Sequence, residues 1–324
     1  MIKLEGVTKS FARVNGSLSA ARPAVDNVSF EVDEGETLVL LGTSGSGKTT
    51  TLRMINRLVE PSGGAITIQG RNIQDVSPET LRRGMGYVLQ ESGLFPHYTV
   101  AENIAVVPRL LRWDARRIAD RTTALLEKLS LPPDRYRDAY PSELSGGQAQ
   151  RVGLARALVA DQPILLMDEP FGALDPITRV DIRKDFKSLN SVNRRTVILV
   201  THDVEEAFEL GDRVVLMTEG RIAQWGSPAD LLFRPASDFV RAFFESQRLA
   251  LELGVVRVRD VWEALPPSAS VAAARPLSAD APLREALEAT LAAPDDRVAL
   301  THDGATKTVG AGDLFTAFHA YKNR

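Results

Sequence analysis

Residues 42–49, Gly-Thr-Ser-Gly-Ser-Gly-Lys-Thr, constrain this chain more than any other stretch. They follow an apolar, strand-like segment at 37–41 and precede a helix-like segment at 50–59. A strand, a glycine loop ending in Lys-Thr and a helix, in that order, predict a phosphate-binding loop. The glycines let backbone N–H groups turn towards an anion, and the helix N-terminus adds partial positive charge. The alternative is a Gly/Ser-rich turn that matches the pattern by chance.

The loop predicts a nucleotide site with defined roles for two side chains. Lys48 can reach the β- and γ-phosphates, and the Thr49 hydroxyl can hold Mg²⁺. The other members are expected to contact the phosphates beside them. The whole predicted set is Gly42, Thr43, Ser44, Gly45, Ser46, Gly47, Lys48, Thr49 and Thr50.

The composition is that of an ordinary globular protein. With a net charge of −3, the chain of 324 residues has no excess of positive charge that would favour nucleic acid. It has no cysteine, which excludes disulfides, thiolate metal sites and a cysteine nucleophile. The first residues carry charge where a secretory signal needs an apolar run, and no segment reaches the roughly 18–20 apolar residues of a membrane span. We expect a cytoplasmic protein that reaches a membrane only through a partner.

Strand-like and helix-like segments alternate after residue 145. This alternation predicts a parallel α/β sheet with helices on both faces. A last helix at about 238–251 is expected to close the domain. The alternating elements are a helix at about 146–160, strand 164–167, helix 176–192, strand 196–200, helix 203–210 and strand 213–217.

Two carboxylates, Asp168 and Glu169, follow the apolar strand at 164–167. The carboxyl ends of parallel strands face the ligand crevice. Asp168 is therefore placed to hold Mg²⁺, directly or through water, and Glu169 to orient or deprotonate an attacking water. The alternative is a pair of solvated carboxylates that begin a loop.

A second potential anion site lies at residues 144–148, Leu-Ser-Gly-Gly-Gln, before an amphipathic helix. Ser145 stands where a helix N-cap belongs, so N–H groups and a helix N-terminus are again offered. Two such sites cannot bind one nucleotide unless the chain folds tightly back or pairs with a second copy. Taken alone, the motif is equally typical of an ordinary Ser-Gly cap.

Together these motifs resemble the ATPases of the ABC-transporter family over residues 1 to about 245. The resemblance implies an α/β fold: a P-loop NTPase (RecA-like) core with an antiparallel β subdomain and a helical subdomain at about 91–154. It also implies that two ATP molecules, with Mg²⁺, lie between two copies in a head-to-tail dimer. The family signature, which contacts the γ-phosphate of ATP held by the other copy, would comprise Ser145, Gly146, Gly147 and Gln148.

The resemblance assigns four further residues. Gln90 would sense Mg²⁺ and the attacking water, and His202 would contact the γ-phosphate as the switch histidine. Asp175, in the segment 173–175, would couple the two sites across the dimer. Phe11 would stack on adenine, although the loop after it is longer than is usual in the family. From the residues alone, His202 can be structural and Phe11 can be a core side chain.

One phosphate loop without membrane spans fits an importer ATPase made separately from its permease. The implied partners are integral membrane permease subunits and, indirectly, an extracytoplasmic solute-binding protein, with the chain at the cytoplasmic face of the membrane. Residues 90–108 and 54–57 resemble osmoprotectant importers for glycine betaine, carnitine and choline. The apolar residues 94–96 suit a permease coupling helix, or else belong to the subdomain core.

The residues after 245 form a separate expectation. Residues 246–275 are expected to be a helix and linker, and 276–324 a small α/β module. That module resembles a single cystathionine-synthase-type (CBS) repeat, which implies regulation, a dimer contact or a vestige. Its predicted elements are a helix near 283–291, a strand near 297–301 and a helix near 311–321.

The sequence leaves three other functions open. The chain could serve another small solute, such as an amino acid or a polyamine. It could be a nucleotide-gated regulatory protein without transport. It could also be a P-loop kinase, although the segment at 144–148 argues against that class.

Overall fold

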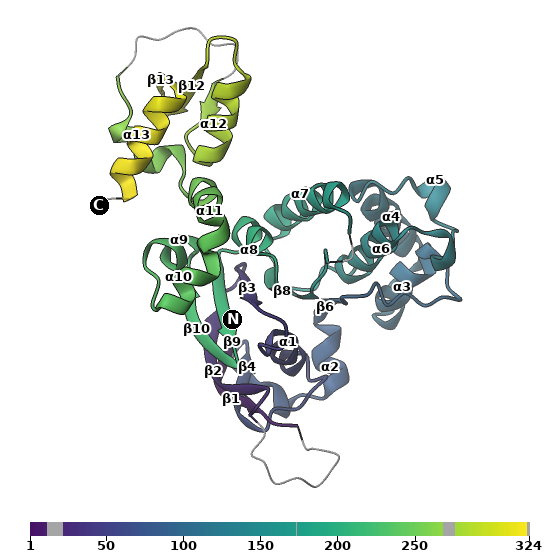
Figure 1. Ribbon diagram of the computed structural model, residues 1–324. Coiled ribbons are helices and arrows are strands. Elements are labelled where there is room, and N and C mark those ends of the chain that lie inside the picture. Colours follow the sequence, from purple (N-terminus) through teal and green to yellow (C-terminus); the bar gives the residue numbers. More distant parts are fainter. Residues whose placement is uncertain (12–21, 173, 268–275, 323–324) are drawn as a thin grey trace. The chain divides into compact units, whose positions relative to one another are not determined.

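The computed structural model describes residues 1–11, 22–172, 174–267 and 276–322, without the side chains of 190–193 (Figure 1). It divides into two compact units, Met1–Trp225 and Gly226–Arg324. The boundary expected near residue 245 therefore falls inside the second unit.

A six-stranded sheet forms the centre of the first unit, in the order β10-β9-β3-β8-β7-β6. From β9 to β6, neighbouring strands pair in parallel. β3, β7 and β8 are buried along their whole length, as expected of strands covered on both faces. The predicted parallel α/β sheet is thus confirmed. Its strands are β3 (Thr37–Gly42), β6 (Met85–Val88), β7 (Ile164–Asp168), β8 (Thr196–Thr201), β9 (Arg213–Thr218) and β10 (Arg221–Gly226).

A second, antiparallel sheet in this unit has the order β2-β1-β4-β5. Alternate residues of β2 are buried, because one face of the sheet packs on the core and the other faces solvent. Buried residues of α1, such as Leu52 and Ile55, share one core cluster with residues of both sheets. The strands are β1 (Ile2–Lys9), β2 (Val25–Val32), β4 (Gly63–Ile68) and β5 (Arg71–Asn72).

Helices α3 to α6 pack against one another and lie side by side in Figure 1. Capping residues define their starts, for instance Thr99 before α3 and Ser145 before α6. The helices of the first unit are α1 (Lys48–Ile55), α2 (Pro78–Arg83), α3 (Val100–Leu110), α4 (Ala115–Lys128), α5 (Pro133–Tyr136), α6 (Gly146–Leu158), α7 (Pro176–Asn193) and α8 (Val204–Leu210).

The second unit has its own core around Trp262 and Phe318 and a sheet in the order β11-β12-β13. The single helix expected at about 238–251 is wrong, since a 3₁₀ turn at Glu245–Gln247 separates α10 from α11. The elements are α9 (Pro228–Phe233), α10 (Asp238–Phe244), α11 (Arg248–Val255), β11 (Leu277–Ser278), α12 (Leu283–Ala292), β12 (Arg297–His302), β13 (Ala305–Gly310) and α13 (Ala311–Lys322).

Candidate functional site

The glycine loop reaches α1 through backbone conformations that require glycine. Gly42 has φ 151°, and a Cβ there would lie 2.2 Å from the carbonyl oxygen of Met217. Gly47, the N-cap of α1, has φ 98°, and its Cβ would lie 2.5 Å from the carbonyl oxygen of Ala24. The loop therefore packs closely against the backbone at Met217 and Ala24, and only glycine fits at these two positions. It leads directly into the N-terminus of α1, which offers N–H groups to an anion.

Lys48 is buried beneath this loop. Its Nζ donates to the carbonyl oxygens of Gly42 and Thr43, each at 2.8 Å, and to Ser46 Oγ at 3.4 Å. Burial lowers the pKa of Lys48, and the nearby carboxylates oppose that shift. The loop thus holds a cation at its centre and leaves Ser44 and other members of the predicted set exposed or half-buried.

Thr49 and Asp168 meet at the carboxyl end of β7. Thr49 Oγ1 donates to Asp168 Oδ1 at 2.8 Å. Asp168 is 1% exposed, and burial raises the pKa of its carboxyl. Its Oδ2 accepts no hydrogen bond from the described residues, and the guanidinium of Arg53 lies 3.6 Å away. A hydroxyl and a partly unpaired carboxylate provide oxygen donors of the kind that Mg²⁺ prefers.

Two residues that follow neighbouring strands meet at the carboxylate of Glu169. Gln90 lies two residues after β6, Glu169 directly after β7 and His202 directly after β8. Glu169 Oε2 accepts from Gln90 Nε2 at 3.2 Å, and His202 Nδ1 lies 3.3 Å away. Glu169 has φ 44°, a strained conformation of the kind found at functional sites. The structure therefore brings together the three residues predicted to be catalytic.

Ser145 and Gln148 use their side chains within their own helix start. Ser145 Oγ accepts from the Gln148 N–H at 3.3 Å, and Gln148 Oε1 accepts from the Ser145 N–H at 2.9 Å. Gln148 Nε2 also donates to Tyr136 Oη at 2.9 Å. Among the described residues, no hydrogen bond joins residues 145–148 to the phosphate loop, so the two predicted anion sites are separate in one chain.

Asp175 directly precedes α7, and its Oδ1 accepts from the Thr178 N–H at 3.0 Å. Hydrogen bonds from Thr178 hold the pKa of Asp175 below its usual range. Ala173, in the same predicted segment, lies outside the described residues. Phe11 is 56% exposed, with Lys9 Nζ 5.1 Å from its ring centre. The alternative that Phe11 is a core side chain is therefore wrong, while its stacking on adenine stays a prediction.

Sequence reasoning missed Arg53, Arg179 and Glu206, which also lie near this edge of the sheet. Arg53 stands four residues after Thr49, a spacing that places both side chains on one face of α1, so a helical projection would have found it. For Arg179 and Glu206, the sequence contained no comparable spacing signal. Arg179 and Glu206 come from α7 and α8, whose packing depends on contacts distant in sequence.

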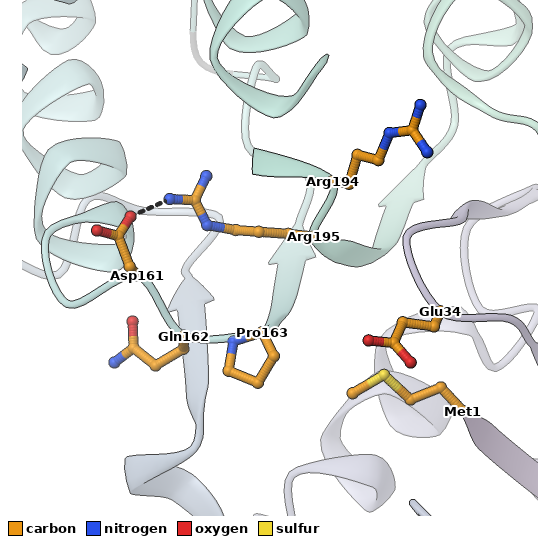
Figure 2. A pocket seen from close by; sticks show the side chains of 7 residues that line it. All are labelled: Met1, Glu34, Asp161, Gln162, Pro163, Arg194 and Arg195. Carbon is orange, nitrogen blue, oxygen red and sulfur yellow. Dashed lines mark hydrogen bonds and ion pairs between the residues drawn. The ribbon is translucent and has the colours of Figure 1, made fainter. Parts of the chain in front are cut away.

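A hollow of about 300 Å³ lies away from these residues, at the amino ends of β7 and β8 (Figure 2). Figure 2 shows Pro163, which precedes β7, and Arg195, which precedes β8, with Arg195 paired to Asp161 at 2.5 Å. The hollow contains none of the predicted site residues. It therefore does not belong to the nucleotide site.

Glu206 should make stability depend on pH. Burial, with a contribution from Asp203, raises its pKa from 4.5 to about 8. The folded protein then holds a proton that the unfolded chain releases above its ordinary pKa, so the free energy of unfolding falls as pH rises from 4.5 to about 8. A glutamine cannot ionise, so Glu206→Gln should gain about 2–4 kcal/mol over the wild type between pH 5 and pH 8.

Urea unfolding at both pH values measures this difference. Glu205→Gln, at the exposed neighbour on α8, is the matched control and should change little. An equal pH slope in Glu206→Gln and the wild type would show that Glu206 is not protonated in the folded state.

Comparison with known proteins identifies the class. Residues 25–172 match the ABC transporter family. The chain is 50% identical to the osmoprotectant import ATP-binding protein OsmV of Salmonella typhimurium over 82% of this chain and 69% of that one. It is 48% identical to the choline transport ATP-binding protein OpuBA of Bacillus subtilis, over 77% of this chain and 63% of that one. The chain belongs to the ABC transporter family and is an ABC ATPase.

Solved structures agree with this assignment. A dimeric ATP-binding cassette in a post-hydrolysis state with ADP and Pi is 32% identical, with a TM-score of 0.62, covering 70% of this chain and 98% of that chain. The ATP-binding subunit of an ABC transporter is 26% identical, with a TM-score of 0.63, covering 77% and 98%. The expected P-loop NTPase fold with its antiparallel β subdomain is confirmed.

Membrane spans are a separate matter. Within the part of the chain that the structure describes, no helix has the length and apolarity needed to cross a bilayer.

Proposed function

We propose that this chain is the ATP-hydrolysing subunit that powers import of a quaternary-amine osmoprotectant through a separate membrane permease. The convergence of Gln90 and His202 on one carboxylate oxygen of Glu169 carries the proposal for hydrolysis. The solute class follows from relatives named for osmoprotectant, choline and glycine betaine uptake, the last being the YehX protein of Escherichia coli at 48% identity over 78% of this chain and 79% of that one.

The proposed chemistry divides among three groups. Lys48 and the N–H groups of its loop bind the β- and γ-phosphates. Thr49 and Asp168 would hold Mg²⁺, which when bound would neutralise charge on the phosphates. Glu169 accepts a proton from the attacking water, while Gln90 and His202 fix the position of its carboxylate through Oε2.

We place the active ATPase in a head-to-tail dimer. Residues 145–148 form a helix N-terminus that binds no part of its own phosphate loop within the described residues, and α6 begins there. The γ-phosphate held by a second copy fits such a terminus. The dimeric cassette solved with ADP and Pi supports this assembly.

We infer that the permease docks beside the helical subdomain at about 91–154. A cavity of about 360 Å³ there is lined by Asn56, Tyr87 and Gln162, among others. Phe95 is 41% exposed next to this region, which argues against the interpretation of 94–96 as subdomain core. A permease helix at the cytoplasmic face of the membrane would supply apolar contacts to Phe95 and to the apolar lining of the cavity, which includes Leu58, Leu89 and Val107.

We propose a regulatory role for residues 276–324 as a CBS-like module after the linker at 246–275. Its support is the sheet β11-β12-β13 and a core that this segment shares with residues 253–265 of the segment before it. The proposed ATPase domain remains 1–245, with the helices α9 and α10 as its last elements.

Uptake in cells tests the proposed function. In a strain lacking this chain, uptake of radiolabelled glycine betaine, carnitine and choline at raised osmolarity should fall to background. The wild-type chain should restore it and Glu169→Gln should not. Labelled amino acids and polyamines measured in parallel detect the alternative solutes. Unchanged uptake of all three quaternary amines in the deletion strain would contradict the proposal.

A further inference from the structure

Arg179, in the first turn of α7, contacts the segment that precedes α7 and the turn that follows β8. Its Nη2 donates to the carbonyl oxygen of Leu174 at 3.1 Å. Its Nη1 donates to Asp203 Oδ2 at 3.4 Å. Leu174 directly precedes Asp175, and Asp203 directly follows His202. One guanidinium therefore joins the start of α7 to the histidine turn.

The contact with Leu174 extends to the signature segment. A Cβ built on Gly147 would lie 3.1 Å from Thr178 Cγ2 and 3.5 Å from Leu174 Cδ2. The start of α6 thus packs directly on the segment that Arg179 holds. A displacement of Gly147 towards Leu174 or Thr178 would press on that segment, because the space between them is already filled.

Asp203 in turn fixes the histidine turn. Its Oδ1 accepts from the Glu206 N–H at 3.1 Å and caps α8, while its own N–H donates to Thr201 Oγ1 at 3.0 Å. His202 lies between these anchors. Arg179 Nε is buried without an acceptor among the described residues. An unpaired buried donor is costly. The guanidinium therefore depends on its two hydrogen bonds, to Leu174 and to Asp203, to keep its position.

We propose that Arg179 is a positioning residue that makes the signature segment and His202 of one chain move together. The inference rests on the proposed dimer, in which residues 145–148 face the ATP of the other copy and His202 faces the ATP of its own. A shift caused by one nucleotide would then reach the other through Leu174, Arg179 and Asp203. In this proposal Arg179 acts through Leu174 and Asp203 and is assigned no contact with ATP or the attacking water.

Two conservative variants isolate this link. Arg179→Lys keeps the positive charge but cannot bridge both partners with a planar fork. Asp203→Asn keeps an oxygen to cap α8 and loses the carboxylate. Arg183→Lys is the control, because Arg183 also joins α7 to α8, through Glu209 at 3.1 Å, without contacting Leu174 or Asp203.

For each variant, the rate of ATP hydrolysis is measured as a function of ATP concentration. ATP affinity and thermal stability are measured on the same proteins. We expect Arg179→Lys and Asp203→Asn each to lower the maximal rate about 10-fold and the Hill coefficient to about 1, with ATP affinity kept. The double variant should lose no more than either single one, since both remove the same contact. Arg183→Lys should keep the wild-type Hill coefficient.

Three results would overturn the inference. These are wild-type cooperativity in Arg179→Lys, additive losses in the double variant, or the same loss of cooperativity in Arg183→Lys. If the wild-type enzyme is active and a variant gives any of these results, only the link through Arg179 is contradicted, and the proposed function stands. A wild-type chain that hydrolyses ATP without cooperativity also contradicts the link, and one without hydrolysis contradicts the proposed function as well.

Discussion

Glu169→Gln is expected to lower the rate of ATP hydrolysis about 100-fold or more while leaving ATP affinity nearly unchanged. Glutamine has almost the same shape and can still accept from Gln90, so the geometry around the γ-phosphate is kept. It cannot take a proton from water, which removes the general base. Because ATP then persists between the two copies, the variant should also accumulate as a dimer when ATP is added.

Steady-state phosphate release and size-exclusion chromatography with ATP measure these effects. Glu205→Gln removes an exposed carboxylate from α8 and should behave as the wild type in both. Hydrolysis at the normal rate in Glu169→Gln would remove Glu169 from its assigned role.

Lys48→Ala is expected to weaken ATP binding at least about 100-fold, because charge-assisted hydrogen bonds to phosphate are stronger than neutral ones and the loop has no second cation. The structure holds Lys48 Nζ on the carbonyl oxygens of Gly42 and Thr43, at the centre of the loop. Isothermal titration calorimetry with ATP measures the affinity.

Loss of the same contacts can also loosen the loop itself. Thermal unfolding of Lys48→Ala without nucleotide separates this effect from the loss of binding, and Lys128→Ala at the exposed end of α4 is the matched control. An affinity within threefold of the wild type in Lys48→Ala would contradict the assignment of this loop.

The sequence predicted the edge of the sheet where the site lies but not the contacts within it. Apolar runs followed by Asp168 or His202 indicate strand ends, and parallel strands place their carboxyl ends together. The order of the strands decides which ends are adjacent. The contact between Glu169 and His202 follows from β7 lying beside β8, a long-range pairing that local patterns do not encode.

Two errors in the second unit differ in whether a local sequence signal was present. β13 was not expected, although Asp303 and Gly304 both have positive φ and form the turn of the β12–β13 hairpin. An Asp-Gly pair between short apolar segments is a typical hairpin signal, so this strand was predictable. The division of α10 from α11 was not, because Glu245–Gln247 carries no glycine or proline.

The interpretation of Ser145 as an anion-binding cap shows a further limit. Its capping geometry was predicted from the sequence and is present. What it binds depends on a second copy of the chain, and one chain cannot supply that information. The link through Arg179 was missed for a related reason, since Leu174 and Asp203 lie far apart in the sequence.

The account rests on ATP lying between two copies of this chain. A crystal structure of Glu169→Gln with ATP and Mg²⁺ tests it most directly. We predict two nucleotides per dimer, each held by Lys48 of one copy and by residues 145–148 of the other. A nucleotide bound to the Lys48 loop with no residue of a second copy near its γ-phosphate would contradict the account.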